Sequence, residues 1–132
     1  MQDFPSENLF LFKLVKKLYI MTAITDEYMQ EMLTKTKEYH IVRLKPGPRA
    51  KDHPDIRKLI WEHGRRNFSL RADGFLSIVC PVTAETGVNG IGIFNTSAQE
   101  TKNIMDRDPA VQAGIFVYDI HPCRSFPGDA LP

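Results

Sequence analysis

Two polar side chains lie on the apolar face of a predicted helix, where they could take part in chemistry. At about 100° per residue, His63 and Asn67 fall within one stripe with four aliphatic residues, which are Ile56, Leu59, Ile60 and Leu70. A buried polar group without a partner costs about 1–3 kcal/mol, so both side chains need partners. A histidine beside a carboxylate could act as a general acid–base. A core histidine bonded to a backbone carbonyl is the structural alternative.

Asp108 is the candidate carboxylate partner of His63. It follows the second predicted helix, at an end where the macrodipole disfavours negative charge. The pair Asp108-Pro109 is also typical of an N-cap followed by proline in a new helical turn. One carboxylate oxygen could cap that turn while the other meets the imidazole. We therefore expect a hydrogen bond between His63 and Asp108 that lines a cavity.

Other reactive residue types give weaker signals. Arg66 could bind an anionic substrate near the pocket mouth, and solvation on the helix surface is the alternative for Arg65 and Arg66. Cys80 and Cys123 stand in no CxxC arrangement and are expected to be small apolar residues in a reducing compartment, although a disulfide between them stays open. No Cys or His pair has ligand spacing, so we expect no metal site.

Breakers, caps and apolar runs predict six elements that would position these residues. They are strands at 39–44, 75–82, 88–95 and 115–120, a helix at 54–72 after an N-cap at Asp52, and a helix that begins at the Ser97–Glu100 capping box. Gly90 and Gly92 within a strand indicate close backbone approach or a bulge. Residues 122–132, with three prolines, are expected to be irregular.

The order β-α-β-β-α-β predicts a ferredoxin-like α+β sandwich, in which both helices cover one face of a four-stranded antiparallel sheet. Val79, Ile91, Ile93 and Phe116 are candidates for one face or the other. An apolar uncovered face is usually buried by a second subunit, so a homodimer is expected. A covering role for residues 26–37, which have a helical pattern, is the alternative.

Charge and length limit the class of protein. The chain has 132 residues, the length of one domain, and a formal net charge of +1. This balance argues against a protein that binds nucleic acid through a strong basic field. The RNA-recognition motif shares the strand order, but residues 89–95 carry isoleucines where aromatic side chains would stack on bases. We expect no nucleic-acid partner.

The N-terminal segment has a different pattern. Residues 9–24 are rich in apolar side chains but are interrupted by Lys13, Lys16 and Lys17, so no run approaches the roughly 20 residues of a transmembrane helix. The pattern predicts a basic amphipathic helix that could touch a membrane surface or a partner. An extension docked on its own domain, or one not always translated because Met21 could be a start, are the alternatives. We expect a cytoplasmic protein and no membrane association.

Several motifs together resemble the YciI-like (YCII-related) family. They are residues 61–67 (WEHGRRN), 70–74 (LRADG), Pro81 and 105–114 (MDRDPAVQAG). The resemblance covers about residues 38–122, with 1–37 as a helical extension and 123–132 as a proline-rich tail. It implies a dimeric α+β barrel and a His–Asp dyad, which falls on His63 and Asp108. Where the family often has Gly-Pro, this chain has Cys80-Pro81, so Cys80 would narrow the pocket or add a thiol.

The residues and the resemblance lead to two functional hypotheses. The first is a small enzyme that moves protons on a small organic substrate, as an isomerase, a lyase or a dehydrochlorinase. Its catalytic residues would be His63 and Asp108, and its substrate contacts would be Asn67, Arg66, Pro81 and Cys80. Such reactions need no organic cofactor or metal, and one family relative is a dehydrochlorinase. The second is a non-catalytic ligand-binding or assembly module in which the two residues form a satisfied buried pair.

Overall fold

The computed structural model describes residues 8–11, 13–14 and 21–132, and the chain divides between Lys35 and Thr36 into two units. In the first unit, residues 8–11 and 13–14 are helical, and α2 (Asp26–Thr34) begins where Thr25 Oγ1 accepts the N–H of Tyr28. Much of the predicted basic helix, including Lys16 and Lys17, lies outside the described residues. Within the described part of the chain, no helix combines the length and apolar character needed to cross a bilayer.

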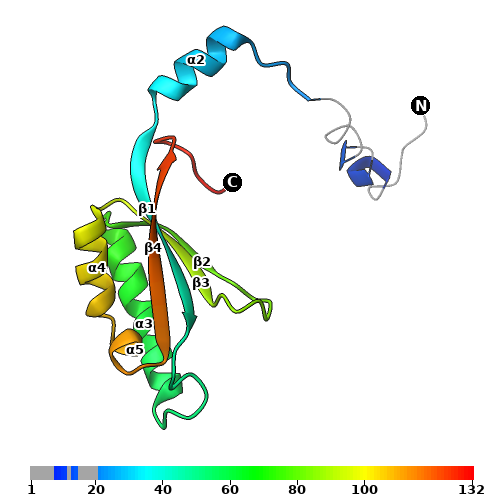
Figure 1. Cartoon of the computed structure of the whole chain (residues 1–132). Helices are drawn as coiled ribbons and strands as arrows, with labels where there is room; N and C mark the ends of the chain where they lie inside the picture. Colours follow the sequence, from blue (N-terminus) through cyan, green and yellow to red (C-terminus); the bar gives the residue numbers. More distant parts are fainter. Residues whose placement is uncertain (1–7, 12, 15–20) are drawn as a thin grey trace. The chain divides into compact units, whose positions relative to one another are not determined.

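The second unit has the predicted ferredoxin-like α+β arrangement (Figure 1). Its four strands are all antiparallel to their neighbours and lie in the order β2-β3-β1-β4. The strands are β1 (Lys37–Pro46), β2 (Leu76–Pro81), β3 (Gly90–Phe94) and β4 (Phe116–Ser125). The helices α3 (Ile56–Ala72), α4 (Ala98–Asp106) and α5 (Pro109–Gln112) lie on one side of this sheet. The predicted fold class is confirmed.

Several predicted boundaries are wrong, and three of them change the description of an element. The helix expected over 26–37 ends at Thr34, because Lys37 already pairs in β1. The last strand continues to Ser125, since β1 and β4 pair along ten residues, and an edge strand tolerates a proline such as Pro122. The expected irregular tail is therefore shorter. Helix α3 begins at Ile56, with Asp55 rather than Asp52 at the N-cap.

The sheet has a covered face and a bare face, because successive side chains of a strand point to opposite sides. In β1, His40, Val42 and Leu44 are buried against the helices, while Ile41 and Arg43 point the other way. The buried apolar core consists of Val42, Leu44, Leu76, Phe94, Met105, Ala110, Ile115 and Phe116. The register assigns the four residues whose face was left open: Val79 and Phe116 belong to the covered face, and Ile91 and Ile93 to the bare face.

Gly47 holds the start of the loop before α3 against the turn after α5. Its N–H donates to the carbonyl of Ile115 at 2.7 Å, and the N–H of Arg49 donates to the carbonyl of Gly114 at 2.8 Å. A Cβ at position 47 would lie 2.3 Å from the carbonyl oxygen of Gly114. The two backbone segments are therefore packed too closely for any side chain at this position.

We expect Gly47→Ala to lower the free energy of unfolding by about 1–3 kcal/mol, the usual cost of overpacking a close contact. Urea unfolding followed by circular dichroism measures this change. Gly64→Ala is the matched control, since a Cβ at this helical glycine meets nothing within 4 Å and alanine favours a helix over glycine. Equal stability of the two variants would contradict the close approach.

Candidate active site

His63 and Asp108 are joined by the predicted hydrogen bond. Nδ1 of His63, on α3, lies 2.7 Å from Oδ2 of Asp108, the N-cap residue of α5. The other carboxylate oxygen, Oδ1, accepts the backbone N–H groups of Ala110 at 2.9 Å and Val111 at 3.2 Å. One oxygen thus caps the short helix while the other meets the imidazole, as the sequence predicted. The catalytic role of the pair stays a prediction.

The carboxylate of Asp108 is buried and ionised. Its side chain is 1% exposed, and that of His63 is 12% exposed. Burial acts to raise the pKa of Asp108, but hydrogen bonds from His63 and from the N–H groups of Val111 and Ala110 outweigh it and hold that pKa below its ordinary value. An ionised carboxylate only accepts hydrogen bonds. The neutral imidazole therefore carries its hydrogen on Nδ1 and has its lone pair on Nε2.

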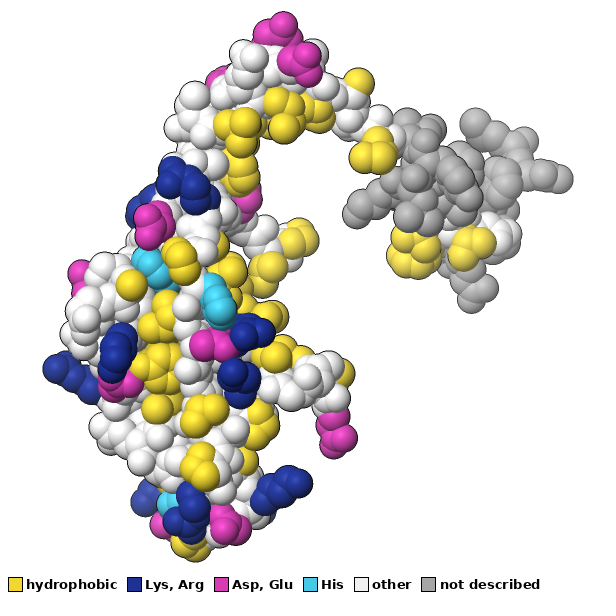
Figure 2. Space-filling view, in the orientation of Figure 1, with side chains coloured by type: hydrophobic (Ala, Val, Ile, Leu, Met, Phe, Trp, Pro, Cys, Tyr) yellow, Lys and Arg dark blue, Asp and Glu magenta, His cyan; other side chains and the backbone are white. Residues whose placement is uncertain are grey.

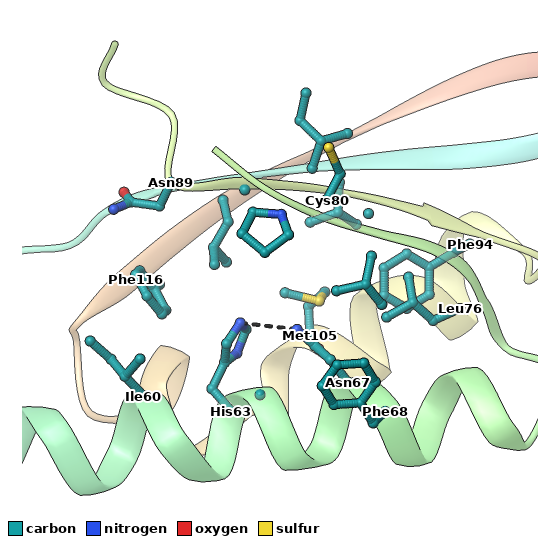
Figure 3. Close-up of a pocket in the computed structure, with 18 residues that line it drawn as sticks. Ile60, His63, Asn67, Phe68, Leu76, Cys80, Asn89, Phe94, Met105 and Phe116 are labelled. Carbon is teal, nitrogen blue, oxygen red and sulfur yellow. Dashed lines mark hydrogen bonds between the residues drawn. The ribbon is translucent and has the colours of Figure 1, made fainter. Parts of the chain in front are cut away.

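The second ring nitrogen of His63 meets Asn67, one helical turn further along α3. Nε2 lies 3.2 Å from the side-chain nitrogen of Asn67, and Figure 3 shows this contact at the α3 side of a pocket. The ring of Phe116 packs against the imidazole with centroids 5.1 Å apart. The helical stripe had identified His63 and Asn67 together, but no sequence signal had connected Phe116 with the histidine.

Arg66 lies on the carboxylate side of the pair. Its Nη1 is 3.8 Å from Oδ2 of Asp108, and this buried nitrogen has no hydrogen-bond partner within the described part of the chain. Arg66 is not among the residues that line the pocket. The geometry therefore brings Arg66 to Asp108 and not to the expected position at the pocket mouth.

The pocket between α3 and the sheet is small and mostly apolar. Its volume is about 280 Å³. His63 and Asn67 are its polar groups on α3, and Asn89 adds an amide from the sheet side (Figure 3). None of the described residues that line it is Lys, Arg, Asp or Glu. Such a pocket can hold a compact neutral molecule beside the imidazole of His63.

Pro81 and Cys80 both line the pocket, but they point in different directions. A register irregularity lies between Leu76 and Ile78, and it reverses the alternation of β2. Pro81 therefore pairs with Gly90 on the covered face, whereas Cys80 pairs with Ile91 on the bare face. Figure 3 shows the sulfur of Cys80 directed away from His63. The structure does not bring the thiol to the histidine.

Two glycines of β3 leave room for the pocket. Gly90 and Gly92 lie on the covered face, opposite Leu44 and Val42 of β1, and both line the pocket. A Cβ at Gly92 would lie 3.1 Å from side-chain atoms of Leu76 and Phe94. The close neighbours of Gly92 are thus side chains and not another backbone segment, and the register irregularity lies on β2. A Cβ at Gly90 would meet only ordinary contacts, at 3.5 Å or more.

We expect Gly90→Val to reduce the affinity of the pocket for a small apolar probe by at least about tenfold, or 1.4 kcal/mol, with little loss of stability. The added methyl groups would occupy pocket volume, and valine is favoured in strands. Benzene titration, followed by methyl chemical shifts of the pocket residues, measures the affinity. Gly64→Val, on the opposite wall, tests whether filling from α3 has the same effect. Unchanged benzene affinity in Gly90→Val would contradict the assigned pocket.

The lowered pKa of Asp108 predicts part of the acid sensitivity of the fold. The stability that this carboxylate contributes is complete above the ordinary Asp pKa of about 3.9. It is lost as the pH falls through the lower pKa of the folded state. We expect the stability difference between wild type and Asp108→Asn to shrink below about pH 4. Urea unfolding at a series of pH values measures it, and the exposed Asp129, replaced by Asn, is the control.

Among the described residues, no group of three or more His, Cys, Asp or Glu side chains could hold a metal ion. His40 is buried and its Nδ1 lies 2.8 Å from the carbonyl of Thr96, which is the arrangement of a structural histidine. His121 is exposed on β4 and contacts Asp119. Neither of them approaches the pocket around His63.

Comparison with known proteins gives distant structural likenesses. No family model matches the chain, and no curated protein matches it. One similar solved structure is 5-chloro-2-hydroxyhydroquinone dehydrochlorinase from Burkholderia phenoliruptrix AC1100, in complex with 2,5-dihydroxybenzoquinone. The TM-score is 0.44 and the identity 16%, over 63% of this chain and 90% of that chain. The methylated RPA0582 protein is also similar, with a TM-score of 0.37 and 14% identity over 81% of this chain and 96% of that chain.

Proposed function

We propose that the protein is a YciI-like enzyme that transfers a proton on a small neutral organic substrate. His63 is the general acid–base. Asp108 orients its imidazole ring and stabilises the imidazolium form. The observation that carries this proposal is the 2.7 Å contact between Nδ1 of His63 and a buried carboxylate, because it leaves the lone pair on Nε2, which meets Asn67 at the wall of an apolar pocket. A base in such a place is within hydrogen-bond reach of a substrate bound in the pocket.

The proposed reaction begins with neutral His63. Nε2 takes a proton from an activated carbon or hydroxyl group of the substrate, and the electron pair of that bond stays on the substrate. The imidazolium that forms is stabilised by Asp108, whose carboxylate stays ionised. If the proton returns to another atom, the result is an isomerisation. If the electron pair expels a leaving group such as chloride, the result is an elimination, and His63 later gives its proton to solvent.

The lining of the pocket supports a neutral substrate. A charged group loses its hydration on burial and needs an opposite charge in compensation, and the described residues of the lining supply none. The polar contacts available are the amides of Asn67 and Asn89. We therefore favour a compact ring with one or two hydroxyl or carbonyl groups as the substrate class.

Deuterium exchange tests the proposed function without knowledge of the natural substrate. Small neutral cyclic enones, phenols and chlorinated diols are incubated with the protein in D2O, and loss of C–H signals and release of chloride are followed. We expect exchange or chloride release for compounds that bind the pocket, and a slower rate in Gly90→Val. Binding in the pocket is detected by chemical-shift changes at Gly92 and Phe116. Compounds that bind in this way but react only at the uncatalysed rate would overturn the proposal.

The alternative is a non-catalytic ligand-binding or assembly module. One observation favours it: each polar atom that the pair presents already has a partner, since Asn67 meets Nε2 and two backbone N–H groups meet Oδ1. A satisfied buried pair needs no chemistry to explain it. Ligand binding without turnover in the exchange experiment would support this second function.

We further propose that the protein forms a homodimer through the bare face of its sheet, in the cytoplasm. Ile91 and Val117 are 37% and 42% exposed there. Beside them, Asp119 accepts from Arg43 at 2.7 and 2.9 Å and pairs with Lys45 at 3.0 Å. Figure 2 shows charged and histidine side chains gathered beside hydrophobic ones on this unit. The free thiols of Cys80 and Cys123 suit a reducing compartment.

Light scattering after size exclusion tests the dimer. We expect a mass of twice 15.1 kDa for the wild type and a monomer for Ile91→Lys, because a lysine there would place a second positive charge next to Arg43 in the interface. Lys58→Ala, at an exposed position of α3 on the other side of the sheet, is the control. A monomeric wild type at micromolar concentration would overturn the proposed dimer.

A further inference from the structure

The side-chain amide of Asn67 faces the reactive nitrogen of His63 and has a donor group and an acceptor group to offer it. We infer that this amide rotates when His63 changes its protonation state, donating to Nε2 of the neutral ring and accepting from Nε2–H of the charged ring. Asn67 is then a positioning residue that supports both forms of the base. The catalytic meaning of this inference rests on the proposed function, but the hydrogen bonds themselves do not.

The first step of the inference is that Nδ1 of His63 is fixed as a donor. Oδ1 of Asp108 is occupied by the N–H groups of Ala110 and Val111, which leaves Oδ2 for the imidazole at 2.7 Å. A carboxylate bound in this way cannot turn without uncapping α5. The imidazole therefore keeps its Nδ1–H toward Asp108 in both protonation states.

The second step concerns the other nitrogen of the ring. In the neutral imidazole Nε2 is an acceptor, and the side-chain nitrogen of Asn67 at 3.2 Å is its donor. When Nε2 takes a proton, two donors would face each other across this contact. A half-turn about the last side-chain torsion of Asn67 exchanges nitrogen for oxygen at the same place. The backbone of α3 does not need to move.

The surroundings of Asn67 permit this rotation. Among the described residues, His63 is the hydrogen-bond partner that the structure records for its side chain. The pocket beside it, of about 280 Å³, gives the amide space to turn. A network of further hydrogen bonds to Asn67 would have locked one orientation, and the structure contains no such network in its described part.

Few charged groups face His63, so the amide of Asn67 is the neighbouring group that can adjust when Nε2 is protonated. Asp108 approaches from α5, and Arg66 of α3 lies 3.8 Å from the same carboxylate. The sheet contributes the ring of Phe116 and pocket residues without charge, apart from the thiol of Cys80, which points to the bare face. A single amide rotation therefore satisfies the protonated ring without a second ionisable group.

The rotation would also set an order of events in the proposed reaction. While the amide donates to Nε2, the lone pair of the base is occupied, and a substrate proton can reach it only when that donor leaves. Once the proton has arrived, the amide oxygen holds the imidazolium in the same orientation. Asn67 thus donates to the neutral base before the reaction. It then accepts from the imidazolium and holds it in place until the proton returns to the substrate.

Nuclear magnetic resonance of the histidine nitrogens and side-chain amides tests the inference on the full chain. His63→Gln identifies the His63 signals. In the wild type we expect the neutral ring to carry its hydrogen on Nδ1, and the Asn67 amide signals to shift with the same pH midpoint as His63. This readout needs no variant at Asn67, so it remains decisive if such variants fail to fold.

Two substitutions separate a rotating amide from a fixed donor. Asn67→Leu removes the hydrogen bond to Nε2 from both the neutral and the charged ring. The two losses offset each other, so we expect the pH midpoint of His63 to move by less than about half a pH unit. Asn67→Asp favours the charged ring and should raise the midpoint by about 1–3 pH units. Asn103→Leu, at an exposed position on α4, is the matched control and should leave the His63 midpoint unchanged.

Three results would overturn the inference. A rise of more than about one pH unit in Asn67→Leu would show a fixed donor that supports only the neutral ring. A neutral ring with its hydrogen on Nε2 would contradict the Nδ1 assignment. Asn67 amide signals that ignore the titration of His63 would exclude the rotation. A failed deuterium-exchange assay would overturn the proposed function but not these hydrogen bonds, so the two failures are distinguishable.

Discussion

Replacing Asp108 with alanine should lower the free energy of unfolding by about 3–5 kcal/mol, the usual cost of removing one partner from a buried charged contact. The substitution would leave Nδ1–H of His63 and the N–H groups of Ala110 and Val111 without their acceptors. It would also leave the nearby guanidinium of Arg66 without its counter-charge. The effect is large because one carboxylate joins α3 to the start of α5.

Urea unfolding at neutral pH, followed by circular dichroism, measures this loss. Ser97→Ala is the matched control, since Ser97 caps α4 by accepting one N–H, that of Glu100 at 3.1 Å, and such a cap contributes about 1 kcal/mol. Asp108→Asn should lie between the two, because its amide oxygen can still cap α5. A loss in Asp108→Ala no greater than that in Ser97→Ala would show that Asp108 acts as a cap alone.

Replacing His63 with glutamine should lower the rate of catalysed deuterium exchange by about 10²–10⁴-fold, the usual contribution of a general acid–base. Glutamine can still donate an N–H to Asp108, so the fold should be retained. It cannot accept a proton at neutral pH, because an amide is not a base. The prediction therefore separates the chemistry of His63 from its packing beside Phe116.

The exchange rate and the unfolding free energy should be measured on the same preparation of His63→Gln. His121→Gln is the control, because His121 is an exposed histidine that contacts Asp119 on the bare face and lies outside the pocket lining. We expect wild-type exchange in that variant. Full exchange activity in His63→Gln would exclude His63 as the base, and a loss of folding without any activity to lose would favour the assembly module.

The fold and the central contact were predictable from local signals. Caps, glycine stops and apolar periodicity define elements whose order admits few topologies, and the structure has the antiparallel order expected. The contact between His63 and Asp108 was predictable because each residue was unusual in its place. A histidine on an apolar stripe needs a partner, and an Asp-Pro pair offers one oxygen for capping and another to share.

The placement of Cys80 and Arg66 was not predictable from the same signals. The alternation along β2 changes phase between Leu76 and Ile78, where Ser77 interrupts the apolar run, but one serine does not by itself indicate such an irregularity. The helical wheel places Arg66 on the flank of the His63 stripe, but it does not say that α5 lies against that flank. Cys80 does line the pocket, as expected, but the direction of its thiol and the neighbour of Arg66 both depend on tertiary packing.

Because Gly90 and Gly92 have no side chains, the sheet layer sets the space of the pocket, while the helix layer carries His63 and Asp108. His63 and Asp108 belong to α3 and to the N-cap of α5, whereas Gly90 and Gly92 of β3 line the space beside them. A change of one residue on β3 would thus alter which molecules are admitted while leaving the base and its carboxylate in place. The size of the pocket can therefore be changed from the strand without altering the contact between His63 and Asp108.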